Sequence, residues 1–510
     1  MPTRRSTLTW KSLWLGALVL VLAAIPSVTS ASGTLRMAIV ADAESLDPIL
    51  PSDNPSIWTM LLVFDQLVRS GVDGKSIEPG LAQKWEISKD GKTYTFHLRK
   101  AQFSKGDPVT VDDVVYSLER ARGEKSRWAS FFRPIDSVKA LDAGTVQITL
   151  KEAFSPFLAN LALFSASIVP KAAAEQAGDE FATKPVGSGP FMLERWDKGS
   201  RIVLAKNPHY WQAGKPHLDQ VEFQIIGEDN TRMLKVQAGE VDVAADVPAN
   251  MLQTLRGQKD LRVQIVDQYR SDFVNFNTTK TPFTDKKIRQ AMNLAVDRAA
   301  LIKAVLYGSG LPENTYLPKG MKYWDPGVKA YPFDLAQAKK LIAESSKPQG
   351  FPAELMVQSG DTAFNQVAVI LQDQWKAIGI TVKITQIEGG AHWDTTKKME
   401  YDLATQYMTS DTIDPDQLTG FAVVNPGRAK AFYTGYTNPE VNALFERGRT
   451  TPDGPAREAI YKKMQAIVKD DAPFVYLYSI PARYVYRAPV KGFAVLPTGN
   501  YRLEEVSLTK

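Results

Sequence analysis

Alternation of apolar and polar residues predicts a β-hairpin early in the chain. Residues 84–87 and 94–98 alternate on either side of Asp90 and Gly91, a pair that favours a tight turn. A helix should follow, because Thr110 can cap its first turn and apolar residues then recur at helical spacing. The expected apolar face consists of Val111, Val114, Val115 and Leu118. The pattern therefore predicts a hairpin, a loop and an amphipathic helix.

Helices and strands alternate in the second half of the chain. Asp334 and Gln337 are spaced as the two ends of a capping box, which predicts the start of a helix. An apolar stripe over 367–378 ends at Gly379, a typical residue after a helix, and a strand is expected directly afterwards at 380–384. This alternation predicts an α/β architecture.

Several longer patterns carry a family resemblance. Residues 79–99 contain P-x-L-A-x-x-W-E-x-S-x-D-G-x-T-Y-T-F-x-L-R, and residues 103–117 contain F-S-x-G-x-P-V-T-x-D-D-V-V-Y-S. Both resemble the bacterial extracellular solute-binding proteins of family 5, the oligopeptide, dipeptide and nickel receptors of ABC importers. Residues 185–191 are similar to the V-G-T-G-P-Y turn of that family, and their two glycines predict a turn or a close backbone approach. The resemblance covers about 35–493.

The resemblance implies a two-lobed α/β fold, the type II-like periplasmic binding protein fold with an extra subdomain in the first lobe. A length of 510 residues agrees with a division into two or three domains. We expect a signal peptide over 1–32, lobe I over 33–275 with an inserted subdomain at about 75–185, lobe II over 276–483, and a return to lobe I over 484–510.

The first residues have the three parts of a secretory signal. A basic start precedes an apolar run over 13–25, and Pro26 and small residues follow. This run is too short to span a bilayer comfortably, so we expect cleavage rather than a membrane anchor, and a periplasmic location. Arg4 and Arg5 hint at twin-arginine export, but Thr7 departs from that pattern and favours the Sec route.

Composition excludes several classes of partner and chemistry. The net charge of +5 includes three basic residues of the expected signal peptide, which leaves 5 − 3 = +2 without basic clusters and argues against a nucleic-acid partner. The absence of Cys excludes disulfides and thiolate catalysis. The resemblance instead implies a monomer whose partners are a small-molecule or peptide ligand and the transmembrane subunits of an ABC permease.

No catalytic signature is present. The chain lacks G-x-S-x-G, H-E-x-x-H and P-loop patterns, and its four histidines lie far apart. We therefore expect no enzyme activity, no catalytic residues, no metal site and no cofactor. The alternatives that stay open are a secreted peptide or amide hydrolase, a receptor of the same fold for an opine or a metal chelate, and a sensor or chaperone without transport.

The strongest ligand-binding candidate is Asp411. Residues 401–416 resemble the dipeptide-receptor motif G-W-T-G-D-x-x-D-P-D, whose first Asp pairs with the ligand's ammonium group, and the resemblance assigns this role to Asp411. A carboxylate in a closing cleft makes strong charge-assisted hydrogen bonds to an ammonium group. The alternative role, in turns and caps, is favoured for Asp414 and Asp416. Met408 stands where the motif has Trp, which would give a softer wall.

Other candidates are weaker, and one expected residue is missing. Dipeptide receptors place an Arg for the ligand carboxylate near residues 362–367, where this chain has none, so a longer peptide or an amine such as an opine is as plausible as a dipeptide. Glu44 could meet a cationic group or be a solvated loop charge. Trp128 could stack on the ligand or be buried under its loop. Arg270 could pair with a carboxylate or lie on the surface.

Overall fold

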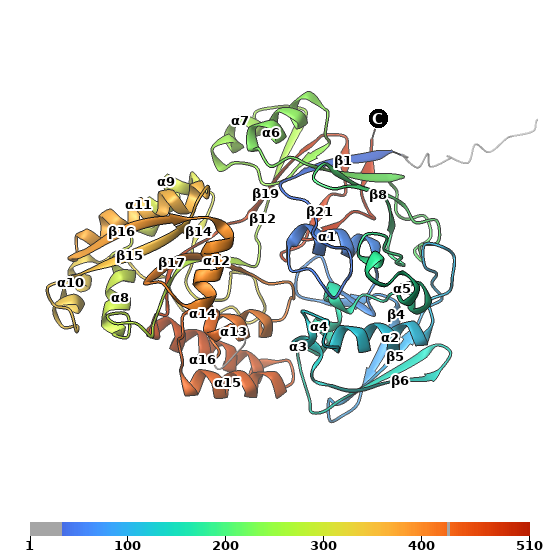
Figure 1. Ribbon diagram of the computed structural model, residues 1–510, viewed down its shortest axis with the longest axis horizontal. Helices are drawn as coiled ribbons and strands as arrows, with labels where there is room; N and C mark the ends of the chain where they lie inside the picture. Colours follow the sequence, from blue (N-terminus) through green and yellow to red (C-terminus); the bar gives the residue numbers. More distant parts are fainter. Residues whose placement is uncertain (1–32, 426–428, 510) are drawn as a thin grey trace, which may run out of the picture.

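The computed structural model describes residues 33–425 and 429–509, so the expected signal peptide lies outside the described residues. Two large sheets organise the chain, and helices pack on both, which confirms the predicted α/β class (Figure 1). No helix within these two ranges is both long and apolar enough to cross a bilayer.

The first large sheet has seven strands, and its central strand is the first strand of the chain. β1 lies parallel to both of its neighbours, β10 and β11, so the carboxyl ends of these three strands meet at one edge. The strand order is β12 (Leu261–Val266), β19 (Ala482–Arg487), β11 (Val243–Ala244), β1 (Thr34–Ile39), β10 (Gln220–Ile225), β9 (Arg201–Lys206) and β8 (Phe191–Asp197).

The predicted hairpin and helix are confirmed and belong to a four-stranded antiparallel sheet. Its strand order is β4 (Ala82–Ile87), β5 (Thr93–Leu98), β7 (Thr145–Leu150) and β6 (Ile135–Asp142). The helix α2 (Val111–Arg122) begins with the expected capping box, in which Thr110 and Asp113 each accept a backbone N–H bond from the other. This sheet and α2 lie at the lower right of Figure 1.

The second large sheet has six strands. β15 is parallel to β16 and to β17, so these three carboxyl ends also share one edge. The strand order is β14 (Leu311–Pro312), β18 (Phe474–Ser479), β13 (Arg270–Phe276), β17 (Leu403–Thr409), β15 (Phe351–Gln358) and β16 (Ile380–Ile387).

The helix and strand expected around Gly379 are confirmed. α11 (Thr362–Lys376) buries an apolar stripe against the sheet, Gly379 follows with a φ of +81°, and β16 begins at the next residue. The predicted start of α10 (Leu335–Ala343) is also confirmed, because Asp334 accepts a hydrogen bond from the Gln337 N–H. Near the end of the chain, α15 (Pro439–Thr450) and α16 (Pro455–Asp471) form an antiparallel pair beside the second sheet.

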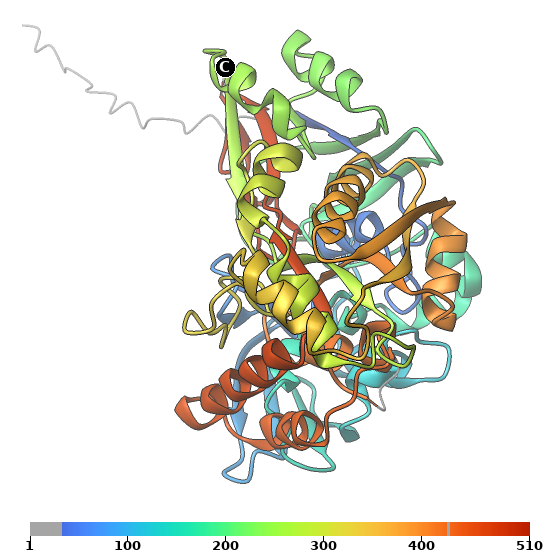
Figure 2. The ribbon, with the colours of Figure 1, turned by 90° about the vertical axis from the view of Figure 1, so that its left-hand side faces the viewer.

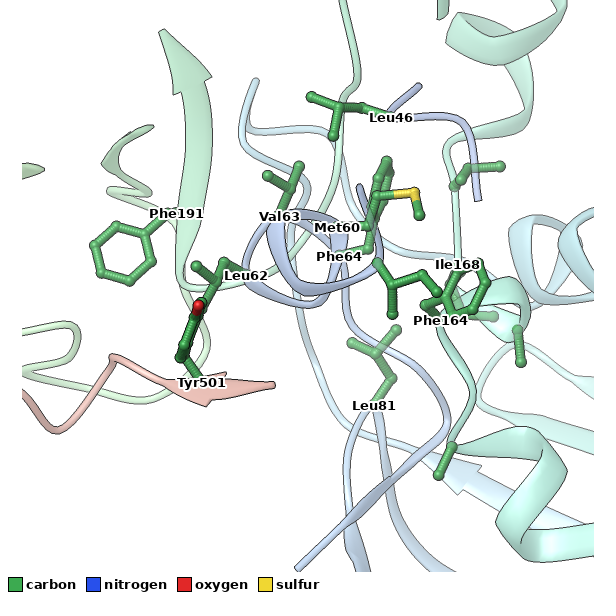
Figure 3. Packing of buried hydrophobic residues seen from close by; sticks show 14 of the residues in the cluster. Leu46, Met60, Leu62, Val63, Phe64, Leu81, Phe164, Ile168, Phe191 and Tyr501 are labelled. Carbon is green, nitrogen blue, oxygen red and sulfur yellow. The ribbon is translucent and has the colours of Figure 1, made fainter. Parts of the chain in front are cut away.

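Helix α1 (Asn54–Val63) lies in the core of the first half of the molecule. Figure 3 shows Met60, Val63 and Phe64 surrounded by side chains from distant segments, and Leu62 facing Phe191 and Tyr501. The glycine turn at 185–191 packs directly against this helix: a Cβ at Gly187 would lie 2.1 Å from the carbonyl oxygen of Val63. The predicted close backbone approach is therefore confirmed.

The described chain passes between the two large sheets at two short crossings. Residues 267–269 lead from β12 to β13, and residues 480–481 lead from β18 back to β19. β12 pairs with β19 and β13 pairs with β18, so the crossings run side by side, as the yellow-green and red segments of Figure 2 show. Each crossing lies within eight residues of a boundary expected from the sequence, 275 or 483, and the lobe boundaries remain a prediction.

Candidate functional site

A cavity of about 550 Å³, here called the central cavity, lies between the two large sheets. On one side it is lined by residues at the carboxyl ends of β1, β10 and β11, including Ile39, Asp229 and Asp246. On the other side it is lined by Arg270 and Tyr407 of the second sheet. The carboxyl edge of parallel strands is where open α/β sheets bind their ligands, so the topology itself marks this place as a site.

Asp246 is an exposed residue that lines the central cavity. It follows β11 with a φ of +52°, a left-handed conformation that costs free energy for a residue with a side chain. Although Asp246 is open to solvent in the cavity, desolvation by the nearby protein raises its pKa, and the guanidinium groups of Arg232, Arg483 and Arg270 oppose that rise. An acidic acceptor therefore stands among cations at this wall.

Arg483 supplies an incompletely paired cation. Its Nε donates to the Val247 carbonyl at 2.7 Å, but its buried Nη1 has no hydrogen-bond partner among the described residues. A buried donor without a partner is costly, so a ligand oxygen that accepts from this nitrogen would bind favourably.

Arg270 lies in the wall of the central cavity. Pairing with a ligand carboxylate was one of the two roles expected for it from the sequence. Its guanidinium donates to both oxygens of Asp272, at 2.7 and 2.9 Å, and lies 4.1 Å from the centre of the Tyr407 ring. These contacts hold the guanidinium in one orientation, which lowers the entropy lost when it binds a ligand. Arg270 can therefore offer a ligand its positive charge and a guanidinium group of fixed orientation, although Asp272 already neutralises part of that charge.

Asp411 lines a smaller cavity of about 50 Å³, which shares Trp58, Thr498 and Tyr501 with the central cavity. Gln417 fixes Asp411 in place: the Asp411 N–H donates to Gln417 Oε1, and Gln417 Nε2 donates to Asp411 Oδ2, both at 2.9 Å. Burial raises the pKa of Asp411, and the Gln417 bond partly offsets this. The Asp411 carboxylate is therefore held in a position where it can accept a hydrogen bond from a ligand.

The two following aspartates make structural contacts. Asp414 forms a buried bidentate pair with Arg457, at 2.6 and 2.8 Å. Asp416, in the first turn of α13 (Asp416–Ala422), lies 3.2 Å from Arg449. The turn and capping region thus holds two ion pairs, whereas Asp411 has none among the described residues.

Three sequence candidates do not line the two cavities. Met408 is only 3% exposed and packs in a hydrophobic cluster, because it points to the opposite face of β17 from Tyr407. Trp128 is buried, stacks on Phe131 and donates from Nε1 to the Pro51 carbonyl at 2.8 Å. Glu44 is an exposed loop residue. Met408 thus does not form the expected softer wall of either cavity, whereas Trp128 and Glu44 show the second of the two roles expected for each, burial under a loop and a solvated loop charge.

Sequence reasoning missed Asp246, Arg483 and Tyr407. Asp246 precedes Val247 and Pro248 and resembles an ordinary loop aspartate, and only its place after a strand parallel to β1 could have marked it. Arg483 and Tyr407 lie in the strands β19 and β17, and the sequence of these strands does not reveal which face of each strand lines the cavity. Within residues 33–425 and 429–509, no group of three His, Cys, Asp or Glu side chains is close enough to hold a metal ion.

Comparisons with known proteins agree on one family. The model of the bacterial extracellular solute-binding proteins, family 5 Middle, matches residues 76–427. A probable D,D-dipeptide-binding periplasmic protein of Escherichia coli K12 is 32% identical, over 94% of this chain and 95% of its own. The dipeptide-binding protein of the same organism is 30% identical, over 89% and 92%.

Solved structures give the same result. A periplasmic binding protein of Helicobacter pylori, in complex with the peptide STSA, is 31% identical and covers 94% of this chain and 98% of its own with a TM-score of 0.82. A binding protein of A. tumefaciens R10, in complex with agropinic acid, is 28% identical and covers 94% and 99% with a TM-score of 0.81.

Proposed function

From the premise that this chain belongs to the bacterial extracellular solute-binding proteins of family 5, we propose that its central cavity captures a zwitterionic peptide or peptide-like solute for import. The chain is a substrate-binding component of an ABC transporter, and its relatives are binding proteins rather than enzymes. Because relatives are periplasmic, we place this protein there too, as a monomer that delivers its solute to the transmembrane permease subunits.

The observation that carries the proposal is the distribution of charge around the central cavity. Arg270 comes from the second sheet, whereas Asp246 and Arg483 come from the first. A solute with both an ammonium and a carboxylate group can satisfy the acidic and basic walls together, and a neutral solute would leave both desolvated without a partner. Asp411, in the adjoining small cavity, is the second acceptor that we assign to an ammonium group.

Capture is proposed to proceed by closure of two lobes that are bounded at the crossings 267–269 and 480–481. The far ends of the two halves already touch: the rings of Phe131 and Phe421 are 6.2 Å apart, and the Ser155 hydroxyl donates to the Thr451 carbonyl at 2.6 Å. A solute that contacts both sheets binds tightly only to this closed arrangement. Its binding therefore increases the fraction of the protein that is closed. No covalent chemistry is involved.

The experiment is a binding panel on the purified protein, with mass spectrometry of any solute that co-purifies. Dipeptides, tetrapeptides, opines and metal chelates are compared by thermal shift and calorimetry. We expect zwitterionic peptides or opines to stabilise the protein without turnover, and Asp246→Asn and Arg483→Gln to weaken binding about tenfold or more. Arg195→Gln, at an exposed arginine outside the central cavity, is the matched control. Binding confined to solutes without an ammonium group, or product release, would overturn the proposal.

A further inference from the structure

A second cavity, here called the distal cavity, lies on the other side of Tyr407. Its volume is about 320 Å³, and Tyr407 is shared with the central cavity. It is lined by residues that follow β15 and β16 and by residues of β17. The distal cavity therefore occupies the carboxyl edge of parallel strands in the second sheet, as the central cavity does in the first.

Aromatic rings form much of the distal cavity wall. Phe364, Trp393, Tyr407 and Phe432 all line it, and the Trp393 and Phe432 rings lie 6.2 Å apart. Trp393 is 40% exposed and Tyr407 is 47% exposed, so large ring surfaces stay open rather than packed. Arg270 lies 4.1 Å from the centre of the Tyr407 ring, whereas Lys397 Nζ lies 5.8 Å from the centre of the Trp393 ring. Trp393 therefore has the more distant cation and offers the freer face to an incoming one.

Three groups that line the distal cavity, one carboxylate and two buried polar atoms, are incompletely paired within the described residues. Asp361 accepts the Phe364 N–H at 2.9 Å as the cap of α11, and it forms no ion pair among the described residues. Thr405 and His392 are 2% and 5% exposed, and Thr405 Oγ1 and His392 Nε2 have no partner within the described chain. Burial lowers the pKa of His392, which leaves its imidazole neutral and able to accept a bond.

The distal cavity also offers little to an anion. No Lys or Arg is among its lining residues, and the nearby Lys397 is paired with Asp394 at 2.7 Å. The two helices that begin at this edge are α11 and α12 (Gly389–Lys398): Asp361 accepts one N–H bond in the first turn of α11, and Glu388 accepts two in the first turn of α12. The capping carboxylates cancel the attraction that a helix N-terminus would have for an anion.

We propose that the distal cavity receives a cationic side chain, an ammonium or guanidinium group, of the solute whose backbone lies in the central cavity. This proposal rests on the proposed function. Because Asp246 is assigned to the backbone ammonium group, a basic side chain in the central cavity would face Arg270 and Arg483, whereas Asp361 and the partly exposed ring of Trp393 stabilise one across Tyr407. The preferred substrate class is therefore a peptide, or a peptide-like solute, with a lysine-like or arginine-like side chain.

Calorimetry with matched dipeptides tests this assignment. Ala-Lys, Ala-Arg, Ala-Met and Ala-Glu, and the same pairs in reversed order, differ in side-chain charge while their backbone charges stay the same. We expect one order of the basic peptides to bind about tenfold or more tightly than its Met counterpart, and the Glu peptide to bind most weakly. Asp361→Asn keeps a capping side chain but removes the charge, so it should abolish the preference without weakening Ala-Met.

The control is Asp334→Asn, the same change at the cap of α10, which should leave every affinity unchanged. Trp393→Leu should weaken only the basic peptides. Equal binding of Lys and Met peptides, or a preference that survives Asp361→Asn, would overturn the distal cavity as a cation site while the proposed function stands. If none of these dipeptides binds, the same Lys, Met and Glu comparison is made in tetrapeptides. If no zwitterionic peptide or opine of the binding panel binds either, the proposed function fails and this inference fails with it.

Discussion

Replacing Asp414 by Asn should destabilise the protein strongly while leaving ligand contacts in place. The Asp414 and Arg457 side chains are 5% and 0% exposed, so the substitution leaves a buried guanidinium without its main countercharge. Removing one partner of a buried ion pair costs about 3–5 kcal/mol. Arg457 keeps its bonds to Asp453 and to the Gly448 carbonyl, and Asn retains one acceptor oxygen, so we expect about 3 kcal/mol.

The assay is thermal unfolding of the ligand-free protein, followed by circular dichroism. For a chain of this size, which unfolds with an entropy of about 1 kcal/mol per kelvin, about 3 kcal/mol corresponds to a decrease in Tm of roughly 3 °C. Asp411→Asn is the matched comparison, since the same change three residues earlier breaks no ion pair among the described residues and keeps the Gln417 contact. Its Tm should stay within about 1 °C, while its affinity for ammonium-bearing ligands falls.

The two variants therefore separate structure from binding within one loop. Should Asp414→Asn unfold at the wild-type temperature, the buried pair with Arg457 contributes nothing to stability and the reasoning fails. An equal loss of Tm for Asp411→Asn would show that Asp411 is another structural aspartate. Unchanged affinity of Asp411→Asn for every ligand would remove it from the site.

Three further outcomes follow from the fold. Burial raises the pKa of Asp65 from 3.8 to about 7, so between these pH values the folded chain holds a proton that the unfolded chain has lost. The contribution of Asp65 to stability therefore falls as pH rises. The Tm of Asp65→Asn should thus increase relative to that of the wild type from about pH 5 to about pH 8, and a constant difference would contradict this. Gly187→Ala should prevent stable folding, whereas Gly199→Ala, with open space around it, should cost only about 1 kcal/mol in chemical denaturation. Trp128→Phe should lose about 1 kcal/mol of stability through its bond to Pro51 and leave ligand affinity unchanged, and weaker binding would return Trp128 to the site.

Local elements were predictable because their causes are local. Thr110 and Asp113 cap α2 through contacts three residues apart, and Asp334 begins α10 in the same way. Gly379 ends the segment after α11 because it adopts a positive φ. These signals act within one turn of the chain, so no knowledge of the tertiary structure is needed to find them.

The site was less predictable because it depends on sheet order and strand parity. Asp246 reaches the central cavity only because β11 lies between β1 and β19, a pairing between residues far apart in the chain. The motif at 401–416 covers β17, but from the sequence Met408 was expected in the wall of the ligand site, whereas Tyr407 lines the central cavity. A shift of one residue reverses the face of a strand, and no local signal fixes that parity.

The positions of the two crossings have a mechanical consequence. Gln268, Tyr269 and Arg270 line the central cavity from one crossing, and Arg483 and Tyr484 line it beside the other. Under the proposed closure, a solute in the central cavity would contact both crossings directly, and small changes in torsion angle there would produce large displacements at the far ends, where Phe131 and Phe421 meet. If the two lobes open and close as proposed, substitutions at Phe131 or Phe421 would change the equilibrium between the open and closed forms without changing any residue that lines the central cavity.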